Sequence, residues 1–272
     1  MNINKTIFFS AALFLLFTQS LCEADISIVS GVSYENIANK GESYTGTIDI
    51  RNNSLEPVEV KLYQTDYNFT CNGHSFYDDP GTMQRSNATW IKFSPQRFVI
   101  PAQTTTIVNF LVQVPANDTL SGTFWSILMV EEIHKQSAES SQRENEKITI
   151  GVNQIIRFGV QIITNVGNTG AGELEFLNAN LVNKKNKRLL QIDTQNNGSR
   201  WFKPILWVEL YDSQGNYIGK FEGGQSRLFP GTSVRYRIDL SNVPIGNYKA
   251  LVVADCGDEN VVGINYTLKF NE

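Results

Sequence analysis

Short segments in which apolar and polar residues alternate follow one another along this chain from Asp25 onward. Such period-two alternation is typical of β-strands that have one buried face. Examples are Ser43–Asn52, Val58–Tyr63 and Thr105–Val114, and turns rich in Gly, Asn and Pro separate the segments. No segment carries the apolar periodicity of an amphipathic helix over a helix-like length. The pattern therefore predicts an all-β protein.

The alternating segments form two groups, and the second repeats the design of the first in shorter form. The first group gives about seven strands in about 140 residues, which is the spacing of an immunoglobulin-like sandwich. The chain has 272 residues, a length that suits two domains of about 100 to 150 residues each. In the second group, Gly246-Asn247-Tyr248 resembles the tyrosine corner of such sandwiches. We therefore expect two tandem immunoglobulin-like β-sandwiches, at residues 25–163 and 173–272, joined by a linker at residues 164–172.

Two parts of the first domain need separate predictions. Ile26–Val29 and Val32–Tyr34 together predict its first strand, because both are apolar and β-branched. Phe69–Ala88 is polar and contains Gly, Asp and Pro, so it predicts a long loop or a decorated hairpin.

The first 24 residues predict a secretory signal peptide. Lys5 precedes the apolar run Ile7–Phe17, and Cys22-Glu23-Ala24 supplies small residues at the −3 and −1 positions of a cleavage site. A lipidated Cys22 is the alternative, but Leu21 stands where such a site has a small residue. We expect cleavage after Ala24 and export to the periplasm, or to the cell surface or medium. No later run reaches the ~18 apolar residues of a membrane span, so we expect no membrane insertion.

Charge and residue types argue against several classes of function. Cleavage removes Lys5 and Glu23, one base and one acid, so the net charge stays at −4 and does not suggest nucleic acid as a partner. Cys71 and Cys256 remain; an oxidising compartment permits a disulfide between them, but their separation does not argue for one.

Catalytic and metal-binding patterns are missing from the sequence. Cys71 and His74 offer two metal ligands where a closed zinc site has four, so we expect no metal. The sequence has no nucleophile elbow, P-loop or dinucleotide fingerprint. We expect no cofactor, no catalytic residues and no enzymatic activity.

Ile148–Ile163 is the stretch from which a binding function is predicted. It begins with alternating β-branched residues, it follows the polar, charged run Ile133–Lys147, and it precedes the predicted linker. A strand in such a position is often at a sheet edge, where unpaired backbone groups can accept a strand from another chain. Strand pairing with a partner is therefore one interpretation of Ile148–Ile163; the other is that its apolar residues face their own core, which period two predicts equally well.

Three motifs follow one another in the first domain: Ser94–Gln103, with its two prolines, then Val112-Gln113-Val114-Pro115, then Gly122-Thr123-Phe124-Trp125. In order and spacing, over about residues 43–163, the chain resembles the PapD-like family of periplasmic pilus chaperones. The resemblance implies that Ile148, Ile150 and Val152, with Ile155 extending the row, are donated to an incomplete subunit. It further implies that Arg157 grips a carboxylate of that subunit. The family's second basic residue has no counterpart here, because Ile26–Tyr34 contains none.

The resemblance thus predicts an exported chaperone whose partner is a secreted subunit of a pilus or another surface fibre. The alternative is a secreted structural or adhesive surface protein that binds a glycan or a protein through Phe69–Ala88. For Arg157, the alternative is a solvated arginine on a strand.

Overall fold

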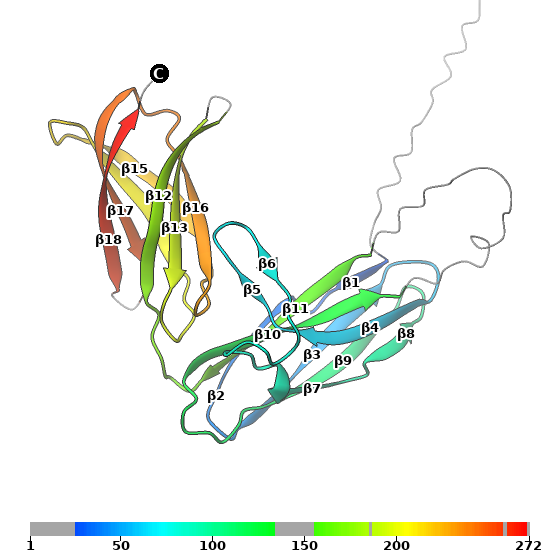
Figure 1. Cartoon of the computed structure of the whole chain (residues 1–272). Coiled ribbons are helices and arrows are strands. Elements are labelled where there is room, and N and C mark those ends of the chain that lie inside the picture. The colour runs from blue at the N-terminus through cyan, green and yellow to red at the C-terminus, as the bar shows by residue number, and fades with distance from the viewer. Residues whose placement is uncertain (1–24, 134–154, 185–186, 258–259, 271–272) are drawn as a thin grey trace, which may run out of the picture.

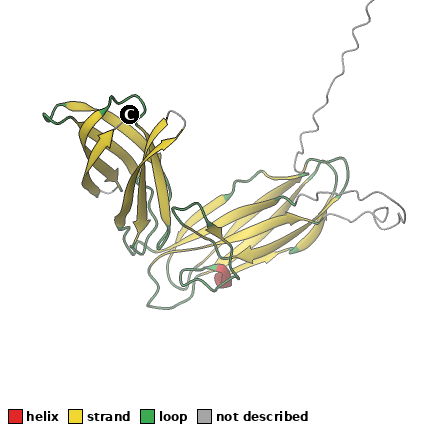
Figure 2. Cartoon of the chain, turned by 45° about the horizontal axis from the view of Figure 1, so that its top comes forward, coloured by secondary structure: helices red, strands yellow, loops and turns green. Residues whose placement is uncertain are grey.

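The computed structural model describes residues 25–133, 155–184, 187–257 and 260–270. These residues form two β-sandwiches in tandem, so the predicted all-β fold with two sandwich domains is confirmed (Figures 1 and 2). A short 3₁₀ turn, η1 (Ala88–Trp90), is the helical element of the described residues, and they contain no helix that could cross a membrane. The predicted signal peptide, residues 1–24, lies outside the described residues, as do Ile148, Ile150 and Val152.

The first sandwich packs a four-stranded sheet against a five-stranded sheet. The four-stranded sheet has the order β1 (Ile26–Ile28), β3 (Ser43–Asn52), β9 (Thr105–Gln113), β7 (Ile91–Ser94). The five-stranded sheet has the order β2 (Ser33–Ala38), β11 (Arg157–Val166), β10 (Gly122–Glu132), β4 (Val58–Thr65), β8 (Arg97–Ile100). All neighbours are antiparallel except β2 and β11, which are parallel.

The core of the first sandwich lies between these sheets and is built from alternate residues of each strand. Ile48 and Ile50 of β3 meet Leu128 and Val130 of β10 in one cluster, and all four side chains are fully buried. Gly46 continues the inward row of β3, because the ring of Phe110 lies over it: a Cβ at residue 46 would be 2.2 Å from Cζ of Phe110. The period-two pattern of Ser43–Asn52 therefore identified the buried face of β3 correctly.

The predicted first strand is divided between the two sheets, which corrects the prediction of one strand over Ile26–Tyr34. β1 pairs with β3, whereas β2 pairs with β11 in the opposite sheet. The chain changes sheets at Gly31, whose φ of +99° is favourable for glycine alone. This change of sheet places β2 beside β11.

The second sandwich has a three-stranded and a four-stranded sheet. The three-stranded sheet has the order β12 (Leu174–Lys184), β13 (Lys187–Asn196), β16 (Ser233–Asp239). The four-stranded sheet has the order β15 (Tyr217–Gln225), β14 (Ile205–Tyr211), β17 (Gly246–Asp255), β18 (Val261–Phe270). The Tyr248 hydroxyl donates a hydrogen bond of 3.0 Å to the carbonyl of Pro244, four residues upstream, so the predicted tyrosine corner is confirmed.

The boundary between the sandwiches lies further along the chain than the sequence suggested. β11 continues through Thr164, Asn165 and Val166, which the prediction assigned to the linker. Thr164 and Val166 are buried in the first sandwich, and all three residues pair with β10. The connection to β12 is therefore residues 167–173.

The predicted decorated hairpin is present between β4 and β7. It contains β5 (Asn68–Phe69) and β6 (Ser75–Phe76), which pair with each other, and it ends at η1. Cys71 of this segment and Cys256, which directly follows β17, are both free thiols.

Candidate strand-pairing edge

β11 has one fully paired side and one partly paired side. Its partner β10 runs alongside all ten residues, from Arg157 to Val166. On the other side, β2 pairs only from Gln161 to Val166. Among the described strands, the segment Arg157–Val160 therefore has no neighbour on its β2 side. We call this segment the open edge.

The backbone direction at the open edge follows from the first bond of the β2 ladder. The Gln161 N–H donates to the carbonyl of Val32 at 2.9 Å. Backbone groups of alternate residues in a strand point to the same side, and the β10–β11 register is uninterrupted. The N–H and C=O groups of Gly159 and Arg157 therefore point toward the side that β2 leaves open. This is the arrangement that a further strand would need.

The side chains of this part of β11 divide between the two faces of the sheet. Val160 is fully buried in the first core, and Phe158 packs against that core. Arg157 and Gly159 face outward, since their neighbours in sequence face in. Ile155 lies two residues before the strand begins and is 50% exposed, so it is available to a partner but is not part of β11.

Arg157 pairs with a carboxylate of its own sheet. Its Nε lies 2.7 Å from Oε2 of Glu131, the residue opposite it on β10, and Nζ of Lys61 on β4 lies 2.9 Å from Oε1. The Tyr63 hydroxyl also donates to Oε2, at 2.8 Å. Glu131 is buried, whereas the side chains of Arg157 and Lys61 are 51% and 44% exposed. We call these four residues the Glu131 cluster.

The electrostatics of the Glu131 cluster follow from its composition. Burial opposes the charge of Glu131, but the hydrogen bonds from Lys61, Tyr63 and Arg157 and the charge of Lys61 outweigh it, so the pKa of Glu131 is below its usual value. The pKa of Tyr63 is raised by burial and by its hydrogen bond to Glu131. One carboxylate with two cations leaves one positive charge next to the open edge.

The two sandwiches meet at the other end of the same sheet. Trp125 of β10 stacks on Phe229 of the second sandwich, with ring centroids 4.7 Å apart and an interplanar angle of 16°. With Ile163 they form a small buried cluster of their own, separate from both sandwich cores. We call Trp125 and Phe229 the stacked pair.

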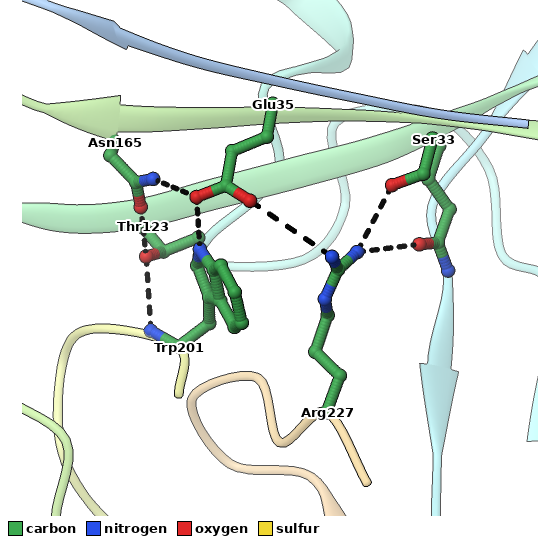
Figure 3. A network of polar contacts seen from close by, with 7 residues as sticks. Ser33, Glu35, Thr123, Asn165, Trp201 and Arg227 are labelled. Carbon is green, nitrogen blue, oxygen red and sulfur yellow. Dashed lines mark hydrogen bonds and ion pairs between the residues drawn. The ribbon is translucent and has the colours of Figure 1, made fainter. Parts of the chain in front are cut away.

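A polar network continues this contact toward β2 (Figure 3). Glu35 of β2 accepts hydrogen bonds from Nε1 of Trp201 at 2.9 Å and from Nδ2 of Asn165 at 2.7 Å. Its other oxygen lies 3.9 Å from a guanidinium nitrogen of Arg227, which stacks on the Trp201 ring at 4.5 Å. The network therefore joins β2 and β11 of the first sandwich to two loops of the second.

Arg227 also marks where the open edge begins. It donates to Ser33 at 3.0 Å and to Gln161 at 3.5 Å, the residue with which β2 pairing starts. The contact therefore bounds the open edge on the side of the second sandwich.

Sequence reasoning selected Arg157 but missed its surroundings. Glu131, Lys61 and Tyr63 are brought together by strand register, and Glu35, Trp201 and Arg227 by the contact between domains. The available signal was the acidic pair Glu131-Glu132 at the end of a largely apolar strand. Across the described residues, no group of three or more His, Cys, Asp or Glu side chains is arranged to hold a metal ion.

No protein-family model matches the chain, and no curated protein matches its sequence. Solved structures of fimbrial chaperones are similar to it. A chain of a chaperone–tip adhesin complex from work on CFA/I fimbriae biogenesis is 15% identical, with a TM-score of 0.48 and coverage of 90% of this chain and 98% of that one. A chain of the CsuC–CsuE chaperone–tip adhesion subunit complex of Acinetobacter baumannii is 13% identical, with a TM-score of 0.46 and coverage of 89% and 98%. The class 5 fimbriae chaperone CfaA is 15% identical, with a TM-score of 0.46 and coverage of 89% and 98%. Fimbrial chaperones, the group that the sequence resembles, are thus among the solved structures similar to this chain.

Proposed function

We propose that this protein is an exported chaperone that binds subunits of a pilus or another surface fibre by lending them a β-strand. The observation that carries the proposal is the open edge of β11, where the backbone groups of Arg157 and Gly159 point to a side without a described neighbour. The motifs that resemble the pilus chaperones support the same function. The protein acts in the periplasm without a cofactor, and it has no catalytic role.

Strand donation would extend the open edge toward the N-terminus. An incomplete subunit sandwich gains ladder hydrogen bonds from the edge and buries the apolar side chains that alternate along the donated strand. Ile148, Ile150 and Val152 are proposed for this role, with Ile155 beside them. Each such side chain contributes roughly 2 kcal/mol when it leaves water.

The Glu131 cluster supports a preference for an acidic group on the subunit. Arg157 binds Glu131 through Nε, and no described residue accepts a hydrogen bond from its Nη groups. With Lys61 beside it, the half-exposed guanidinium can form a charge-assisted pair with a carboxylate of the subunit. Glu131 and Tyr63 would hold the two cations in place.

One observation favours the alternative function. The hairpin between β4 and β7 exposes two aromatic rings, Phe76 at 45%, which contacts His74, and Tyr77 at 54%. Exposed rings on an ordered hairpin are suited to a sugar face or to a protein partner. A secreted adhesive protein would use this surface and would leave the open edge unpaired.

Co-purification from the native envelope tests the proposal. Wild type is compared with a variant that carries Ile148→Asp and Ile150→Asp, and both must fold by circular dichroism. Ile107→Asp is the matched control, because Ile107 is an exposed isoleucine of β9 in the opposite sheet. We expect the first variant alone to lose a small secreted subunit. If the variant retains the subunit, or if none co-purifies with wild type, strand donation is wrong and the adhesive function takes its place.

A further inference from the structure

The hairpin between β4 and β7 leaves the first sandwich and reaches the second. In Figures 1 and 2 it lies between the two sandwiches, with β5 and β6 directed toward the three-stranded sheet of the second. Its two strands are only two residues long each. So short a ladder is marginally stable by itself, so other contacts must hold the hairpin in place.

A buried carboxylate closes the base of the hairpin, and a hydrogen bond from β10 ties that base to the first sandwich. Asp66 is fully buried and accepts hydrogen bonds from the backbone N–H groups of Met83 at 2.7 Å and Gly81 at 3.1 Å. The Ser86 hydroxyl donates to it as well. The carbonyl of the next residue, Tyr67, accepts a 2.7 Å hydrogen bond from Nε1 of Trp125. The start of the hairpin is thereby tied to β10.

The hairpin then makes two contacts with the second sandwich. The Phe69 ring packs edge-on against Phe229, with centroids 6.4 Å apart at 72°. The backbone N–H of Cys71 donates to Oγ of Ser233, the first residue of β16, at 2.9 Å. One contact is apolar and the other polar, and both come from residues that neither sandwich core contains.

These two contacts and the polar network of Glu35 and Arg227 lie on opposite sides of the stacked pair. In the order β2-β11-β10-β4 of the five-stranded sheet, the network lies on β2 and β11, the stacked pair on β10, and the hairpin follows β4. A single contact would leave the sandwiches free to rotate about it. Contacts on both sides of the stacked pair prevent that rotation.

We propose that this hairpin is an interdomain lock, which holds the second sandwich at one fixed angle to the open edge of β11 through Phe69–Phe229 and Cys71–Ser233. A partner that spans both sandwiches then meets a preformed surface, so it does not lose affinity to ordering the two domains. The lock is a property of the free protein, so its test needs no subunit and is independent of the proposed function.

Amide exchange of Cys71 measures how often the lock opens. Phe69→Ala removes the apolar contact, and Phe76→Ala is the matched control, because Phe76 lies in the same hairpin and its ring contacts His74. We expect exchange at Cys71 to be roughly tenfold faster in Phe69→Ala, which corresponds to about 1.4 kcal/mol, and unchanged in Phe76→Ala. Equal rates in the two variants would overturn the lock.

Small-angle scattering measures the consequence for the domains. The double variant Phe69→Ala with Ser233→Ala is compared with Phe76→Ala after circular dichroism has shown that both are folded. We expect a broader distribution of interdomain distances in the double variant alone. If its scattering curve matches that of the control, the hairpin does not set the angle and the proposal is wrong.

Discussion

Gly159 offers the sharpest perturbation of the open edge. Its N–H points to the side without a described neighbour, so Gly159→Pro removes a donor that the β10–β11 ladder does not use. Phe158, the residue before it, is already extended, as a residue that precedes proline must be. The same change in the middle of a paired strand would break a ladder bond.

The expected loss of subunit affinity can be estimated from the groups involved. One missing N–H···O bond costs about 1 kcal/mol, and the proline ring occupies the space of the incoming carbonyl, which disturbs the neighbouring bond. Together these effects cost about 2 kcal/mol, or roughly a 30-fold rise in Kd. The measurement is titration of the co-purifying subunit against purified variants.

Gly159→Ala is the control for the added Cβ, because it keeps the N–H donor and has no ring. A Cβ at residue 159 lies 3.2 Å from Cγ2 of Ile127, so both substitutions share the same close contact. We expect the alanine variant to bind the subunit about as tightly as wild type. If the proline variant binds within twofold of the alanine variant, no strand pairs with β11 at this position.

Three further predictions concern stability. The pKa of Glu131 is lowered in the folded state, so its contribution to stability is present above the unfolded pKa of about 4.3 and is lost as the pH falls through the folded pKa. In thermal melts from pH 7 to pH 3, we therefore expect the Tm of wild type to fall more steeply than the Tm of Glu131→Gln. Parallel curves would refute the pairing. Arg227→Ala removes the stacking on Trp201 and the hydrogen bonds to Ser33 and Gln161, which should cost about 1 to 2 kcal/mol of interdomain stability. In urea, we expect the unfolding of the two sandwiches to separate into two transitions in this variant. A single transition like that of wild type would contradict this. Gly46→Ala places a Cβ 2.2 Å from the Phe110 ring, so it should lower the free energy of unfolding by about 1 to 3 kcal/mol and lower the Tm. An unchanged Tm would mean that the ring moves aside freely.

The architecture was predictable because alternation within a strand reports burial directly. The inward row of β3 follows from the residue types, and the tyrosine corner follows from a local Gly-Asn-Tyr segment, whereas β10 is buried on both faces and does not alternate. Two boundaries were missed for physical reasons. Gly31 gives no sign in sequence that the chain changes sheets there, and Asn165 reads as a linker residue although it bonds Glu35 within a strand.

The site was predictable only in part. The position of a strand beside a domain boundary predicted an edge; in the described residues β2 pairs with Gln161–Val166 of β11, and Arg157–Val160 have no described neighbour on that side. Arg157 was selected without its partners, because Glu131 lies 26 residues before it (157 − 131) and Lys61 lies 96 residues before it (157 − 61). Only the register of the strands brings the three residues together. Contacts between domains, such as Glu35 with Trp201, leave no periodic signal at all.

The most direct test of strand pairing is amide hydrogen exchange at Arg157 and Gly159, measured in the free protein and in the complex with its co-purified subunit. These two amides point to the open side of β11, whereas the amide of Gln161 is already bonded to Val32 and serves as the internal reference. We expect fast exchange at both positions in the free protein and at least tenfold slower exchange in the complex, with Gln161 unchanged. Unchanged exchange at Arg157 and Gly159 in a saturated complex would contradict strand pairing at this edge.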